Sequence, residues 1–153
     1  PYSTNTFFDI RGDGVKHRLS CVADGSFLAL PNASGKIVNI NQLFGNNTVG
    51  ADGKTAANGF LALAKHDSNH DGVINRLDSV FSRLMLWKDD NCDGQARARE
   101  LYSLASRDIV AIKTSSKEMY QVDMYGNITK QRSIVKQGND ELLRIFDVWF
   151  RLY

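Results

Sequence analysis

Residues 89–100 read DDNCDGQARARE, and their first six positions hold three aspartates, an asparagine and a glycine. Without a cation, the carboxylates of so short a turn would repel one another. A hard divalent cation such as Ca²⁺ takes six to eight oxygen ligands, and a twelve-residue loop supplies them from positions 1, 3, 5, 7, 9 and 12, with glycine at position 6. Five of these six positions can serve here, namely Asp89, Asn91, Asp93, the Gln95 carbonyl and Glu100. Position 9 is Arg97, which offers no side-chain oxygen, so we expect water or another segment to fill that place.

The same arrangement occurs upstream in residues 67–78, DSNHDGVINRLD. All six ligand positions carry oxygen in this loop, with Gly72 at position 6: Asp67, Asn69, Asp71, the Val73 carbonyl, Asn75 and Asp78. Asp78 stands where glutamate is usual, and a shorter side chain that binds through one oxygen would weaken Ca²⁺ relative to Mg²⁺. Two such loops in one chain predict two bound Ca²⁺ ions. The alternative is a pair of solvated Asn/Asp/Gly turns without metal.

The spacing of the two loops predicts how they are joined. Residues 78–88 carry Val80, Phe81, Leu84, Met85 and Trp87 at helical spacing. We therefore expect one helix of roughly ten residues, about 15 Å long, that ends the first loop and begins the second. Loops at opposite ends of one helix cannot pair side by side, so each needs a different neighbour. Weaker echoes of the loop pattern, in residues 9–20 and 30–41, are interpreted as metal-free structural relics.

The rest of the chain predicts an α+β fold. Residues 54–66 have the apolar spacing of a second helix, and short runs at 27–30 and 36–40 between Gly and Asn residues indicate short N-terminal strands. After a short turn of helix through Leu104, the pattern changes to period two. A strand at 109–113, a hairpin that turns at 125–127 and alternation over 146–152 predict a small C-terminal antiparallel sheet. No linker divides the chain, so residues 1–153 are predicted to be one domain.

Composition limits the possible functions and partners. The chain has 153 residues and a formal net charge of +2, which favours neither nucleic-acid binding nor binding to a membrane surface. We find no apolar run long enough to span a bilayer and no signal-peptide layout at the start. Because the chain begins with Pro1, we interpret it as a mature fragment or an excised domain. Cys21 and Cys92 either pair with each other or remain two thiols.

Several longer motifs resemble a known family. QLFGNNT, ADGKTAANGF, LALAKHDSNHDG and LMLWKDDNCDG lie within a stretch, about residues 7–104, that resembles the calcium-binding EF-hand-like region of large secreted bacterial surface and repeats-in-toxin proteins. The tail, from VDMYGNITKQRS to FDVWF, is similar to the end of related bacterial EF-hand domains. The resemblance implies an extracellular or cell-surface location. It also implies calcium as a ligand and, as a further partner, another protein or a cell surface. From the charge and the apolar runs we expect no nucleic-acid partner and no membrane insertion.

Our main hypothesis is a calcium-binding domain whose folding Ca²⁺ stabilises, and three alternatives are considered. One is a calmodulin-like sensor, which would need a Met-rich groove opened by calcium, whereas the chain has only three Met residues. In some members of the family this region is a self-processing module. There calcium folds the domain, an Asp-Pro bond at its N-terminal edge breaks, and the new acyl end can be joined to a lysine; such cleavage would leave Pro1 first. We find no nucleophile with its base, so this autocatalysis is the one enzymatic activity that the sequence motivates. The third alternative is a cohesin-binding dockerin, because residues 67–78 look like a dockerin repeat.

Overall fold

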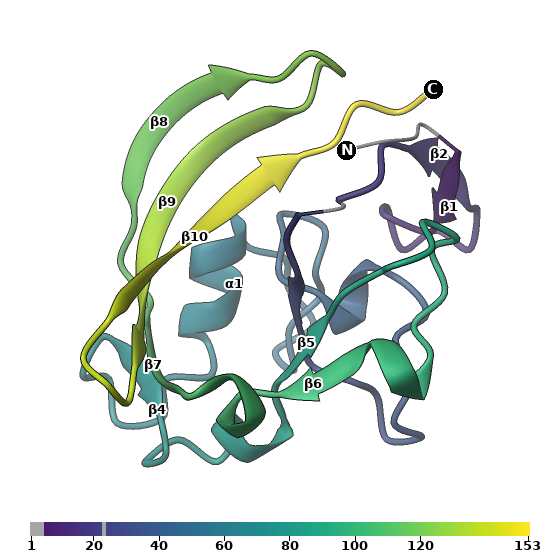
Figure 1. Cartoon of the computed structure of the whole chain (residues 1–153). Coiled ribbons are helices and arrows are strands. Elements are labelled where there is room, and N and C mark those ends of the chain that lie inside the picture. Colours follow the sequence, from purple (N-terminus) through teal and green to yellow (C-terminus); the bar gives the residue numbers. More distant parts are fainter. Residues whose placement is uncertain (1–4, 23) are drawn as a thin grey trace.

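The computed structural model describes residues 5–22 and 24–153. In this part of the chain ten strands form three antiparallel sheets, accompanied by one α-helix and four 3-10 turns (Figure 1). The architecture is therefore mostly β. The expected α+β class, with EF-hand-like loops that share a short helix, is wrong.

The three sheets are built from segments that are mostly distant in sequence. A two-stranded sheet pairs β1 (Thr6–Phe8) with β2 (His17–Leu19), and a three-stranded sheet has the order β3 (Phe27–Ala29), β5 (Met85–Trp87), β6 (Leu101–Ser103). The third sheet has the order β10 (Leu142–Trp149), β9 (Ile128–Gln137), β7 (Ile109–Lys113), β4 (Val73–Asn75), and β8 (Lys117–Val122) also pairs with β9. The helical elements are α1 (Gly59–Ala64) and the 3-10 turns η1 (Ile40–Gln42), η2 (Phe81–Arg83), η3 (Ala98–Glu100) and η4 (Ala105–Arg107).

The predicted shared helix over residues 78–88 is absent. Only the turn η2 is helical there; the chain becomes extended at Leu84 (ψ 139°) and enters β5. β5 is the middle strand of its sheet and lies between the two cores: Leu86, which is half-buried, packs against one and Trp87 is buried in the other. A run of four apolar residues suits a buried strand as well as a helix, and periodicity cannot separate the two. Pairing with β3 and β6 decides the outcome.

Several other predicted elements are confirmed. The helix expected at 54–66 is the shorter α1, and it starts where the Asn58 side chain accepts a hydrogen bond from the Leu61 N–H at 2.9 Å. The strand at 109–113, the hairpin at 125–127 and the C-terminal antiparallel sheet are also present. Residues 36–40 form no strand; Asn39 instead caps η1. Leu104 follows the strand β6 and precedes η4, so the helical turn predicted before it is wrong as well.

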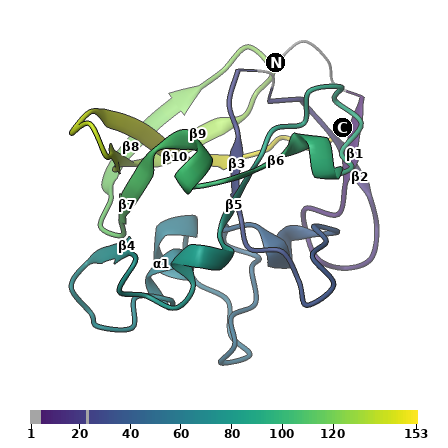
Figure 2. The ribbon, with the colours of Figure 1, turned by 60° about the horizontal axis from the view of Figure 1, so that its bottom comes forward.

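Two apolar clusters form the core, and each of them anchors one acidic loop. The first lies among α1, η2 and the five-stranded sheet and includes Ile74 of β4, which is fully buried. The second surrounds Trp87 of β5, whose ring centroid lies 5.4 Å from that of Phe8 and 5.3 Å from that of Phe27. Figure 2 shows β4 and β5 in different sheets. None of the helices among the described residues has the length and apolar character to cross a membrane.

A buried carboxylate ties β10 to α1. The Asp147 carboxylate accepts a hydrogen bond from the Gly59 N–H at 2.8 Å, at the first residue of the helix, and Asp147 is only 7% exposed. Burial raises the pKa of Asp147, although the hydrogen bond from Gly59 opposes that rise. The ionised form is therefore disfavoured in the folded state.

Replacement of Asp147 by asparagine tests this burial cost. Because the folded-state pKa of Asp147 is raised, its contribution to stability is fully present below the unfolded pKa of about 3.9 and is lost as pH rises through the folded pKa. Asp147→Asn keeps an acceptor for the Gly59 N–H and carries no charge. In chelator we expect the variant to be more stable than wild type at pH 7 and equally stable below about pH 4. Urea unfolding across this pH range measures the difference, and a variant less stable at pH 7 would contradict it.

Candidate functional site

The first loop, residues 67–78, follows α1 and contains β4. The carboxylate of Asp67 accepts hydrogen bonds from the N–H groups of Asp71 (3.3 Å) and Gly72 (2.8 Å). The Asp71 carboxylate in turn accepts from the Val73 N–H at 2.9 Å and from the Asn69 side-chain amide at 2.9 Å. Sequence positions 1, 3 and 5 are thus brought together on the inside of one turn.

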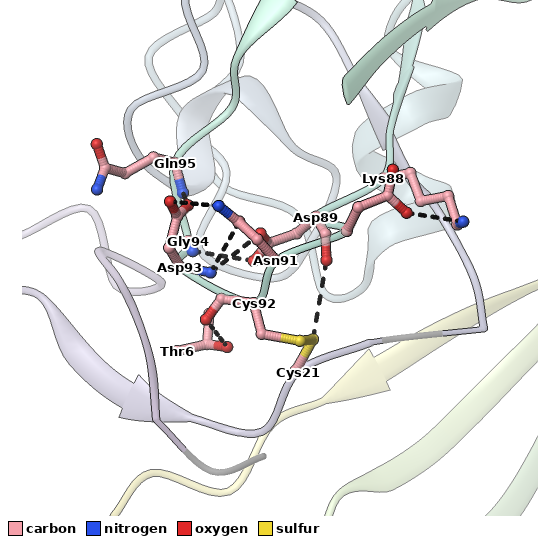
Figure 3. Close-up of a disulfide and its surroundings, with 10 residues drawn as sticks. Thr6, Cys21, Lys88, Asp89, Asn91, Cys92, Asp93, Gly94 and Gln95 are labelled. Carbon is pink, nitrogen blue, oxygen red and sulfur yellow. Dashed lines mark hydrogen bonds and ion pairs between the residues drawn. A yellow bond between two sulfur atoms is a disulfide. The ribbon is translucent and has the colours of Figure 1, made fainter. Parts of the chain in front are cut away.

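The second loop, residues 89–100, repeats this pattern (Figure 3). Asp89 accepts from the N–H groups of Asp93 (3.1 Å) and Gly94 (2.9 Å), and Asp93 accepts from the Gln95 N–H and the Asn91 side chain, both at 2.9 Å. The predicted residues at positions 1, 3 and 5 therefore converge here as they do in the first loop.

The backbone of the two loops is also alike. Position 4 has a positive φ in both, +57° at His70 and +59° at Cys92, and so does position 6, +84° at Gly72 and +70° at Gly94. The weaker echo at residues 9–20 shares this backbone, with positive φ at Gly12 and Gly14 and a hydrogen bond from the Gly14 N–H to Asp9 at 2.9 Å. Residues 9–20, 67–78 and 89–100 therefore contain copies of one turn.

The last position of the two acidic loops is occupied in different ways. Asp78 uses both oxygens within the protein, since it accepts from the Ser68 N–H (2.8 Å), the Ser68 hydroxyl (3.0 Å) and the Asn75 N–H (3.0 Å). Burial acts to raise the pKa of Asp78, but these hydrogen bonds outweigh it and lower the pKa. Glu100 accepts from the Arg97 N–H at 3.0 Å through Oε2, whereas its Oε1 is buried with no hydrogen-bond partner.

Both loops begin and end on buried carboxylates. The exposed fractions are 5% for Asp67, 2% for Asp78, 3% for Asp89 and 1% for Glu100. In the described part of the chain, none of the ion pairs within 4.0 Å involves any of these four residues. Burial raises the pKa of Asp89, and the neighbouring carboxylates of Asp93 and Glu100 add to the effect. Buried charge without a cationic partner is costly, so this arrangement favours an added cation.

The donors of each loop are oxygen atoms of mixed type. Within residues 5–22 and 24–153 there is no group of three His, Cys, Asp or Glu side chains that could hold a metal ion by themselves. A cation in either loop would therefore depend on Asn and main-chain carbonyl oxygens in addition to carboxylates. Such a set suits hard cations such as Ca²⁺ and Mg²⁺.

Arg97 distinguishes the second loop from the first. Its guanidinium Nη1 reaches back four residues and donates to Asp93, while Asn75 at the same position of the first loop accepts from the Leu77 N–H at 2.8 Å. Burial acts to raise the pKa of Asp93, but the hydrogen bond from Arg97 and the smaller contribution of the Gln95 N–H lower it. One carboxylate of the second loop is thus already neutralised by the protein.

The neighbours of the loops differ from each other, and the sequence identified neither. The first loop contains β4, which pairs with β7 in the register Val73↔Lys113. The second loop connects β5 and β6 as a hairpin, closed by Trp87↔Leu101, and a disulfide joins its Cys92 to Cys21. The sequence left this pairing of the cysteines open.

Two supporting residues were missed in the sequence. Ser68 fixes Asp78, and the Thr6 hydroxyl donates to the Cys92 carbonyl at 2.9 Å. Neither residue stands at a ligand position. Thr6 lies outside both loops, so nothing in the sequence pointed to it, whereas Ser68 could have been noticed as a hydroxyl residue at position 2 of the first loop. Pro1, which the self-processing alternative invokes, lies outside the described residues.

Comparison with known proteins identifies a family model and a curated relative that match this chain. Residues 1–151 match the family model described as the SPM domain. The chain is also 36% identical over 134 residues to the iron-regulated protein FrpA of Neisseria meningitidis serogroup C. That alignment covers 86% of this chain and 12% of FrpA, so the chain corresponds to a small part of that relative.

Proposed function

This chain belongs to the SPM domain family, and we propose that it acts as a calcium-binding domain of a secreted or surface-attached bacterial protein, with a fold that two Ca²⁺ ions stabilise. In this proposal the first loop binds one ion through Asp67, Asn69, Asp71, the Val73 carbonyl, Asn75 and Asp78. The second loop binds the other through Asp89, Asn91, Asp93, the Gln95 carbonyl and Glu100.

One observation carries the proposal, the unpartnered Oε1 of Glu100. This oxygen is buried, and Glu100 as a whole is only 1% exposed. Asp89, the carboxylate at the other end of the same loop, is also buried. A buried acceptor without a partner costs about 1–3 kcal/mol, and more when it is charged. A hard cation in the second loop would remove that cost, because Glu100 at position 12 is the place from which glutamate usually binds calcium.

The first loop supports the proposal less directly. Its positions 1, 3 and 5 face inward with the same hydrogen bonds, but Asp78 is already saturated by Ser68 and Asn75. For Asp78 to bind an ion, one of these hydrogen bonds has to open. We therefore expect the first loop to bind calcium more weakly than its complete set of oxygens would indicate.

Calcium would act on folding by mass action. A ligand that binds only the native state adds about 2.7 kcal/mol of stability when its concentration is 100 times its dissociation constant. Because β4, with Ile74, lies within the first loop and β5, with Trp87, ends just before the second loop, order in the loops extends into both apolar clusters. Such a domain would be stably folded where calcium is plentiful and less stable where calcium is scarce. This behaviour suits a protein that folds after export.

Calorimetric titration of the chelator-stripped domain, with circular dichroism on the same samples, tests the proposal. We expect two binding events for Ca²⁺ and a gain of near-ultraviolet signal as the surroundings of Trp87 become fixed. If Ca²⁺ gives no heat at several temperatures and no change in structure, the proposal fails. Mg²⁺ in the same titration measures the selectivity of the two loops.

A change at Arg97 tests the competition inside the second loop. In the wild type the Arg97 guanidinium is bound to Asp93, so an incoming cation has to displace it. Arg97→Ser removes the competitor and supplies a side-chain oxygen at position 9. We expect the affinity of the second loop for Ca²⁺ to rise on the order of tenfold, because a charged hydrogen bond is worth about 1.5–3 kcal/mol and part of this is regained from solvent. Arg99→Ser, in the same loop but at no ligand position, is the control. An unchanged affinity in Arg97→Ser would show that the ion pair does not compete.

A further inference from the structure

A disulfide is attached to the second loop at a residue that lies between two of its candidate ligands. Cys92 stands at position 4, between Asn91 and Asp93, and its disulfide reaches Cys21, which is 71 residues away in sequence, follows the N-terminal strand β2 and is 1% exposed. His70 holds the matching place in the first loop, where it is exposed and has no covalent bond. The two loops thus share a backbone and differ in this tether. Figure 3 shows the disulfide beside the second loop.

The tether is part of a wider contact that holds the second loop from outside. The Sγ of Cys21 lies 3.9 Å from the Asp89 carbonyl oxygen, and the Thr6 hydroxyl donates to the Cys92 carbonyl at 2.9 Å. The backbone carbonyl of Phe7 lies against the Cα of Gly94, where no room remains for a Cβ. Loop residues 92–94 therefore rest on β1, and the disulfide is the covalent component of this contact.

The tether also restricts a conformation that the loop requires. Position 4 has a positive φ in all three copies of the turn, and an L-residue other than glycine adopts that region at a cost on the order of 1 kcal/mol. Gly12 meets this requirement in the Asp9 copy without a side chain, whereas Cys92 meets it at +59° as part of a crosslink. His70 keeps the same angle in the first loop without a crosslink, at +57°, so the turn itself favours this angle and the disulfide adds a restraint. Reduction would remove that restraint from Cys92 and from the positions of its neighbours Asn91 and Asp93.

From these contacts we infer that the Cys21–Cys92 disulfide preorganises the second loop for Ca²⁺ and makes the affinity of that loop, but not of the first, depend on redox state. This inference rests on the proposed function. The reaction is a thiol–disulfide exchange with an external dithiol. The Cys21–Cys92 bond breaks, a disulfide forms in the dithiol, and two electrons and two protons pass to the cysteines.

Linkage makes the coupling reciprocal. If the disulfide strengthens calcium binding by some factor, calcium must favour the disulfide over the dithiol by the same factor. We expect a factor on the order of tenfold, within the usual range for coupled sites, which corresponds to about 30 mV for a two-electron couple. Outside the cell, where disulfides persist, the second loop would hold calcium at its full affinity; in a reducing cytosol it would be weaker.

Two variants assign the effect to a loop. Glu100→Gln silences the second loop and keeps an acceptor for the Arg97 N–H, and Asp71→Asn silences the first loop at an exposed residue. Calorimetry with Ca²⁺ on each variant, oxidised and after reduction by dithiothreitol, measures each loop alone. We expect reduction to weaken calcium binding about tenfold in Asp71→Asn, where the second loop is intact, and to leave Glu100→Gln unchanged.

The second readout is the effect of calcium on the thiol–disulfide equilibrium of each variant. A disulfide that only stabilises the fold would not respond differently in the two variants. The fraction oxidised is measured against the dithiothreitol ratio, in Ca²⁺ and in chelator. We expect calcium to shift this equilibrium about tenfold in Asp71→Asn and not at all in Glu100→Gln. Equal shifts in both variants would mean that the disulfide is coupled only to global folding, and the inference would fall. Calcium binding that is the same in both redox states would refute the inference alone, while no binding by either loop would refute the proposed function with it.

Discussion

Transfer from excess chelator to saturating Ca²⁺ is expected to raise the unfolding free energy of the wild-type domain by about 5 kcal/mol. Each of two sites at 100 times its dissociation constant adds about 2.7 kcal/mol. The double variant Asp71→Asn/Glu100→Gln should lose nearly all of this gain, because it removes one inward carboxylate from each loop. Urea unfolding of both proteins, with and without chelator, measures the two differences.

The behaviour of the double variant in chelator is what makes this prediction specific. Asp71 is exposed, and the side-chain amide that Asp71→Asn introduces keeps an acceptor for the Val73 N–H, so its metal-free cost should stay within about 0.5 kcal/mol. Glu100→Gln replaces the buried carboxylate, whose Oε1 has no partner, by an uncharged amide near the carboxylate of Asp89. We therefore expect the metal-free double variant to be at least as stable as wild type.

A matched control separates ligand loss from loss of charge. Asp90 lies in the second loop at position 2, which is not a ligand position, and it pairs with Lys88 at 2.7 Å. Asp90→Asn removes one carboxylate charge, as each substitution of the double variant does, and should keep the full calcium effect. If this control loses as much of the calcium effect as the double variant, general electrostatics rather than ion binding by the loops would explain the result.

Local sequence was sufficient to predict the inside of each loop. The hydrogen bonds of Asp67 and Asp89 run to residues four and five positions later, and the positive φ at position 6 falls on glycine in both loops. Such turns are decided by residues that are close in sequence. The same holds for α1, which Asn58 caps, and for the hairpin between β8 and β9.

Tertiary contacts decided what the sequence could not predict. The segment expected as a shared helix becomes β5 because β3 and β6, at residues 27–29 and 101–103, pair with it from both sides. The Cys21–Cys92 bond spans 71 residues and depends on β2 lying beside the second loop. Arg97 was recognised as unable to bind a cation, but its return to Asp93 follows from the particular turn of η3. Such long-range pairing is not encoded in any single window of sequence.

The contact between the second loop and β1 leads to the other large effect, at the glycine of position 6. Gly94 and Gly72 hold the same place with similar backbones, φ +70° and +84°. An added Cβ at Gly72 would meet nothing within 4 Å, so Gly72→Ala should cost only the left-handed conformation, about 1 kcal/mol. At Gly94 the Cβ would overlap the Phe7 carbonyl oxygen and come within 3.2 Å of Thr6 Cγ2.

Gly94→Ala is therefore expected to destabilise the domain by about 2–4 kcal/mol, since overpacking against the backbone adds about 1–3 kcal/mol to the conformational cost. The loop has to lift from β1, and the hydrogen bond from Thr6 to Cys92 should break with it. Urea unfolding in chelator measures the two glycine variants without any contribution from calcium. Equal losses in Gly72→Ala and Gly94→Ala would mean that only the backbone angle matters and that β1 does not support the second loop. A larger loss of stability in Gly94→Ala would show that the N-terminal strand β1 packs against the second loop and supports its conformation.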